Sequence, residues 1–145
     1  MNWRRAALVL GVLAVFPTLL THVFLWAIEI RLGLNIHRKP LFVLIPGTFE
    51  IKGASLEWKD QLQVRAGTVS VEFPPTAVVR PYFPMVIQGK NLSVVFEAGL
   101  ADSIGQKEVL FDFVDAELVV GGKTGFDIRS LDAESKTIQF HLKGE

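Results

Sequence analysis

"GTFEIKGASLEWKDQLQVRAGTVSVEF", residues 47–73, alternates apolar and polar side chains along almost its whole length. Alternation with a period of two is typical of strands that bury one face. The apolar parity slips by one residue near Gly53 and again near Gly67, which predicts glycine-associated bulges or bends that let a long strand curve. No amphipathic helix follows this stretch, so the sequence leaves open what covers its apolar face.

The alternating pattern resumes after a proline-rich interruption over 74–84, which we expect to be a loop or a sheet edge. A short helical turn is expected within 98–107, and short turns such as Gly121-Gly122-Lys123 suit an antiparallel meander. Further strands are predicted at about 85–97, 108–120, 125–131 and 136–143. The expected fold is mainly β: a transmembrane helix followed by a curved antiparallel β-meander, shaped as a taco-like half-barrel or a small sandwich.

The N-terminal run from Ala6 to Ile28 contains no Asp, Glu, Lys or Arg. A helix of that length would reach about 35 Å at roughly 1.5 Å per residue, enough to cross the core of a bilayer. Trp3 and Trp26 bracket the run, as expected of aromatic residues in the headgroup layer. A cleaved signal peptide is the alternative, but the run is long and no A-x-A-like site closes it.

Three segments follow from this division: a transmembrane anchor (1–30), a juxtamembrane connector (31–46) and a β-domain (47–145). Basic residues lie on both sides of the span, so charge alone leaves its orientation ambiguous, and we favour an N-terminus inside the cell. The basic residues of the connector either touch anionic headgroups or form a solvated collar. Its run "PLFVLIPG" predicts a first strand or an extended segment.

Small residues recur within the span at intervals of four and three, which places them on one stripe of a helix. Such a stripe lets a second helix approach closely, although alanine and glycine are also common in membrane helices. The predicted helix-packing residues are Ala7, Gly11, Ala14, Thr18 and Thr21.

Composition and motifs argue against several classes of function. The chain has 145 residues, a formal net charge of +0 and no cysteine, which disfavours nucleic-acid binding and excludes disulfides and thiolate chemistry. The three histidines lie far apart in the sequence, no G-x-S-x-G elbow is present, and "GGKTG" at 121–125 lacks the glycine and the helix of a phosphate-binding loop. The acidic residues between 112 and 134 suit solvated strand faces better than a metal site. We therefore expect no enzyme, no metal and no cofactor.

A resemblance to a known family lies in residues 1–97. A short Arg-bearing tail, one anchor helix, "IPGTFEIKGASLEWKDQLQVRAGTVSVEF" and "FPMVIQGKNLSVVFE" resemble the beginning of AsmA-like envelope proteins, which are related to repeating β-groove lipid-transfer proteins. The resemblance implies a taco-shaped sheet on the periplasmic side of the bacterial inner membrane, whose concave face accepts phospholipid or lipopolysaccharide acyl chains. This chain offers only about one repeat of strands, so it would work as an oligomer, end to end with a longer protein, or as an accessory subunit.

The sequence is compatible with three ways of covering the apolar face: the sheet closes on itself, it holds acyl chains, or it docks onto another protein. The second predicts a non-enzymatic protein of lipid transport or outer-membrane maintenance, with membrane lipid as its partner. The third predicts a structural subunit of a multiprotein membrane assembly, which binds other membrane-protein subunits or itself through its helix and sheet edge. The predicted groove residues are Phe49, Ile51, Leu56, Trp58, Val69, Val71, Phe73, Leu92, Val94, Phe96, Phe111, Ile138, Phe140 and Leu142.

Overall fold

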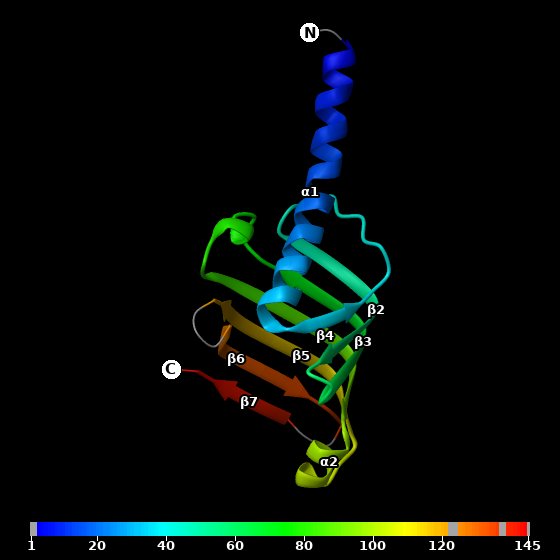
Figure 1. Ribbon diagram of the computed structural model, residues 1–145, viewed down its shortest axis with the longest axis vertical. Coiled ribbons are helices and arrows are strands. Elements are labelled where there is room, and N and C mark those ends of the chain that lie inside the picture. Colours follow the sequence, from blue (N-terminus) through cyan, green and yellow to red (C-terminus); the bar gives the residue numbers. More distant parts are fainter. Residues whose placement is uncertain (1–2, 122–124, 137–138, 145) are drawn as a thin grey trace.

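A computed structural model describes residues 3–121, 125–136 and 139–144 (Figure 1). Seven strands form one antiparallel sheet in which each strand pairs with the next along the chain. Within the described residues β1 and β7 lie at opposite edges and do not pair, so the sheet is open. The predicted mainly β meander is confirmed. The elements are α1 (Trp3–Leu32), β1 (Leu34–His37), β2 (Thr48–Trp58), β3 (Leu62–Glu72), the 3₁₀ helix η1 (Ala77–Val79), β4 (Phe83–Phe96), α2 (Ala98–Ile104), β5 (Glu108–Val120), β6 (Phe126–Glu134) and β7 (Gln139–Lys143).

Most of the predicted strands and the short helical turn are present at the expected places. The strands expected over 85–97 and 108–120 are β4 and β5, and α2 lies within 98–107. In the connector, strand β1 precedes "PLFVLIPG". The run itself, residues 40–47, is not in a strand, which leaves the extended segment of the two alternatives. The predicted turn residues Gly122 and Lys123, and the start of the last predicted strand at 137–138, lie outside the described residues.

The long strands bend where the apolar parity slips, but they do not bulge there. The pairing of β2 with β3 keeps one register from Lys52 opposite Thr68 to Ala54 opposite Ala66, so the bulge alternative is wrong at this level. Gly53 has a φ of 65° and Asn91 of β4 a φ of 53°, a left-handed conformation that reverses the pleat locally. Because Gly53 and Asn91 both lie at the level of Gly67 in β3, the three strands change their inward parity together and the hydrogen-bonded ladder stays in register.

The second half of α1 covers the apolar face of the sheet. Phe24, Leu25 and Ile28 are 2%, 4% and 5% exposed and belong to one hydrophobic core with residues of β2 to β5. Figure 1 shows α1 descending onto the sheet, while its N-terminal half projects away from it. The cover is therefore part of the predicted anchor segment, an arrangement that the three sequence-based alternatives did not include.

The first half of α1 stands free of the sheet. Its side chains from Trp3 to Phe16 are exposed, apart from the half-buried Ala6. Among the described helices, α1 is the one that is long and apolar enough to cross a membrane, with 30 residues. A single helix thus combines a membrane-length apolar segment with a packed structural element of the β-domain.

Candidate lipid-binding groove

An apolar cavity of about 420 Å³ lies between the C-terminal half of α1 and the concave face of the sheet. Its volume falls within the range of about 300–1,000 Å³ that is typical of small-molecule sites. Helix α1 forms one wall and strands β1 to β6 form the others. The lining residues are Phe24, Leu25, Ile28, Leu32, Leu34, Ile36, Phe49, Ile51, Ala54, Leu56, Trp58, Leu62, Val64, Ala66, Val69, Val71, Met85, Ile87, Leu92, Leu118 and Phe126.

The bend across the sheet explains how residues of both parities reach one groove. On β2, Phe49 and Ile51 line the groove before Gly53, and Leu56 and Trp58 line it after Gly53. Without the change of parity the second pair would face the convex side, because alternate side chains of a strand point to opposite faces. The glycine in the middle of the strand therefore lengthens the apolar surface of the groove.

The groove carries no ionisable group among its described lining residues. Methylene chains have no hydrogen-bonding groups, so an apolar lining can hold them by burial and dispersion alone. Among the described residues, His, Asp and Glu side chains form no group that could hold a metal ion. The chemistry that this groove supports is the burial of hydrocarbon.

Seven of the predicted groove residues line the cavity, and the others lie elsewhere. Phe73 is buried in the core, where its ring stacks on Phe24 rather than facing the cavity. Phe140 and Leu142 lie on the edge strand β7 and are 46% and 40% exposed. Ile138 lies outside the described residues. Val94, Phe96 and Phe111 are half-buried outside the lining, and the seven in the cavity are Phe49, Ile51, Leu56, Trp58, Val69, Val71 and Leu92.

Sequence reasoning missed several lining residues. Leu62 and Val64 of β3, and Met85 and Ile87 of β4, have the same period of two as the residues that were singled out, so the pattern could have found them. The α1 residues are different. Their spacing of three and four is hidden because α1 is apolar on all sides, and a periodicity argument then selects no face.

The predicted helix-packing stripe divides between the two halves of α1. Ala7, Gly11 and Ala14 are exposed, and a Cβ added to Gly11 would have no neighbour within 4 Å. Thr18 instead binds the chain's own connector: its hydroxyl donates to the Val43 carbonyl (3.0 Å) and accepts from the Val43 amide (2.9 Å). Thr21 is 0% exposed and donates to the Pro17 carbonyl over 2.9 Å.

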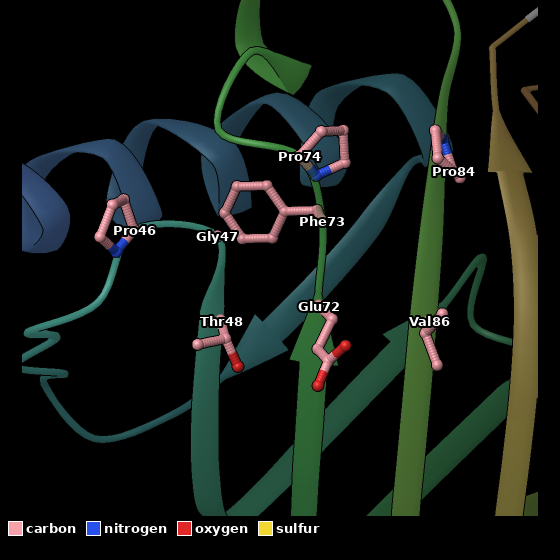
Figure 2. A pocket seen from close by; sticks show the side chains of 8 residues that line it. All are labelled: Pro46, Gly47, Thr48, Glu72, Phe73, Pro74, Pro84 and Val86. Carbon is pink, nitrogen blue, oxygen red and sulfur yellow. The ribbon is translucent and has the colours of Figure 1, made fainter.

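A second hollow, of about 410 Å³, lies where β2, β3 and β4 meet their loops beside α1 (Figure 2). Thr48, Glu72 and Val86 lie side by side on the three strands, with Glu72 opposite both of the others in the register. Glu72 is the charged residue of this lining, and three prolines form its rim. The hollow opens broadly to solvent, so it lacks the enclosure of the apolar groove.

Comparison with known proteins gives no match: no family model, no curated protein and no solved structure is significantly similar to this chain. The function is therefore argued from the geometry of the groove and of the helix that covers it.

Proposed function

We propose that this chain is a non-enzymatic envelope protein, anchored by α1 in the bacterial inner membrane, whose periplasmic β-domain holds acyl chains in its groove. Its role would be in lipid transport or outer-membrane maintenance, with phospholipid or lipopolysaccharide as the bound lipid. One observation carries the proposal: an entirely apolar cavity lies directly beneath a helix whose remaining half is exposed and apolar. The resemblance of residues 1–97 to AsmA-like proteins accords with this reading.

The packing of the domain supports a hydrocarbon occupant. Protein cores are close-packed, and apolar space that is left unfilled loses dispersion contacts on all its walls. Water gains little in such a place because it finds no polar partners. An acyl chain would restore the lost contacts, so lipid binding and stability of the fold are coupled in this proposal.

The length of the groove limits what one copy can do. Seven strands at about 4.8 Å apart give a sheet roughly 30 Å wide. A longer path for lipid needs further strands, and within the described part of the chain no strand pairs with the outer edge of β7. A second copy or a longer partner protein could continue the sheet there by β-augmentation.

Photocrosslinking of the full chain tests lipid binding. The chain would be placed in nanodiscs that contain phospholipid with a diazirine near the end of its acyl chain, and crosslinked peptides would be mapped by mass spectrometry. We expect crosslinks in the groove peptide 54–66, as well as in the free half of α1. Val64→Trp narrows the groove and should weaken the first set relative to the second, whereas Gln63→Trp, on the convex face beside Glu57, should leave both sets intact.

Crosslinks confined to the free half of α1 would contradict the proposal. The cavity would then be part of a closed core, and the alternative reading would take its place.

That second candidate is a structural subunit of a membrane assembly, and two exposed features favour it. The stripe of Ala7, Gly11 and Ala14 is exposed on the free half of α1, and Phe140 and Leu142 are exposed on the edge strand β7. Replacing Gly11 and Ala14 together by leucine should then release partners that co-purify with the wild type, while groove crosslinks stay unchanged. The matched control, Val9→Leu with Val12→Leu, changes exposed residues of the same half of the helix on the side opposite this stripe. Loss of groove crosslinks with partners retained would reject this candidate.

A further inference from the structure

Two loops beside α1 expose large apolar side chains. Phe42, Leu44 and Ile45 lie in the connector, and Val79 and Tyr82 lie at η1 and just after it. We call these five residues the apolar collar; they are between 61% and 84% exposed. Figure 1 shows the connector loop and the η1 loop on either side of α1, at the level where the helix reaches the sheet. Such a cluster of apolar side chains is unusual on a surface that faces water.

Both collar loops are held in place by buried neighbours. Val43, between Phe42 and Leu44, is 6% exposed and its backbone is bound twice by Thr18 of α1. Ala77 begins η1 and is 1% exposed. Because a buried residue anchors each loop in the core, the collar side chains next to it stay exposed in the folded chain.

The length of the free half of α1 points to the membrane as the cover. From Trp3 to Phe16 the helix reaches about 20 Å, whereas the hydrocarbon core of a bilayer is about 30 Å thick. Beyond Phe16 an apolar surface continues on the side away from the sheet through Leu19, Val23 and Trp26, which are 59%, 37% and 63% exposed. A helix from Ala6 to Trp26 measures about 30 Å, which matches the thickness of the hydrocarbon core. If Ala6 lies at one boundary of this core, Trp26 lies at the other, and Thr18, which is at the level of the collar, lies within the core.

The charges of the collar loops suit a lipid surface. Arg38, Lys39 and Arg80 are their ionisable side chains apart from Tyr82, and the sequence has no Asp or Glu from 38 to 49 or from 73 to 96. At the opposite end of the sheet, the α2 loop over 97–108 carries three acidic residues and one lysine. Basic residues next to an apolar insertion surface attract anionic headgroups.

We infer that the apolar collar is a membrane-docking surface, inserted in the leaflet on the side of the β-domain. The inference rests on the proposed spanning of the bilayer by α1 and goes beyond it, because it seats the β-domain in the membrane surface rather than above it. Phe24, which lines the groove, lies less than two helical turns beyond Thr18. The groove therefore begins close to the acyl chains of that leaflet.

Because the chain has no cysteine, single introduced cysteines can carry a label that tests whether the collar lies in the membrane. Leu44→Cys and Val79→Cys report on the collar, Ser103→Cys on the exposed α2 loop, and Leu10→Cys on the free half of α1. Each full-length variant would carry an environment-sensitive fluorophore in vesicles of phosphatidylethanolamine and phosphatidylglycerol. Quenching by aqueous iodide would be compared with quenching by spin-labelled acyl chains, after circular dichroism has confirmed the β-sheet spectrum of each variant.

We expect the labels at positions 44 and 79 to be quenched by the lipid probe and to resist iodide several-fold better than the label at position 103. Iodide quenching at 44 and 79 equal to that at 103, with position 10 still quenched by lipid, would overturn the docking surface and leave the anchor intact. Lipid quenching absent at position 10 as well would show that α1 does not span the bilayer, and both proposals would fall.

Discussion

The ring of Phe24 on α1 stacks on the ring of Phe73 at the end of β3, with centroids 3.7 Å apart and ring planes 2° apart. Phe49 and Phe83 meet Phe24 edge to face, at 6.4 Å and 5.7 Å between centroids. Stacked and edge-to-face arrangements are the favourable geometries for aromatic rings. This cluster joins the helix to β2, β4 and the end of β3, so α1 and the groove form one packed unit.

Removing the central ring should destabilise the β-domain. Phe24→Ala is expected to lower the free energy of unfolding by about 3–5 kcal/mol, because it leaves a cavity in a close-packed core. Chemical denaturation of the full chain in detergent micelles, followed by tryptophan fluorescence, measures the change. Val23→Ala is the control, since Val23 lies on the outer side of the helix and is 37% exposed. Equal losses for the two variants would show that α1 does not pack as described.

The hydroxyl of Thr18 should hold the connector against α1. Thr18→Val keeps the shape of the side chain but removes both hydrogen bonds to Val43, so we expect a loss of about 1–3 kcal/mol and faster hydrogen exchange at the Val43 amide. Thr18→Ser retains the hydroxyl and should keep most of the protection. Exchange at Val43 that is the same in all three proteins would contradict this role.

Asn91 should be sensitive to the conformational preference of its replacement. Its φ of 53° disfavours β-branched residues, so Asn91→Val is expected to destabilise the domain by about 1–2 kcal/mol, whereas Asn91→Gly should be neutral or stabilising. Thermal unfolding by circular dichroism distinguishes them. Ser93→Val tests valine on the same strand at a position without positive φ. A similar loss of stability for valine at 91 and at 93 would show that the positive φ of Asn91 is not the cause.

Truncation should reveal that the β-domain includes half of the helix. A fragment of residues 33–145 keeps strand β1 but lacks Phe24, Leu25 and Ile28, and we expect it to bind hydrophobic dyes and to unfold without a sharp transition. A fragment of residues 17–145 keeps the packed half of α1 and should unfold cooperatively. Calorimetry and dye fluorescence compare the two. A sharp transition for the shorter fragment would mean that the sheet is stable without the helix.

Much of the sheet could be predicted because strand periodicity is a local property. The alternation of Val69 and Val71 with polar neighbours, and the proline-rich break after Phe73, were enough to place β3 and its end. The change of apolar parity at Gly53 was also visible in the sequence, but the sequence did not distinguish a bulge from a bend there. A bulge in one strand and a bend shared by neighbouring strands look alike in one segment, and the pairing of Ala54 with Ala66 decided for the bend.

A membrane-length apolar helix, a meander of long strands and an apolar face too large to remain in water are all predictable from local patterns of residues. The packing of the whole chain was needed to see that Phe24 and Ile28 cover this face and that a cavity lined by Trp58 and Val64 remains beneath them. The reason is that α1 is apolar on every side, and the hydrophobic effect has no direction. A periodic pattern identifies the side that a helix buries only when another side is polar. The sequence of α1 therefore does not indicate which of its sides packs on the sheet, and the shape of the sheet determines it.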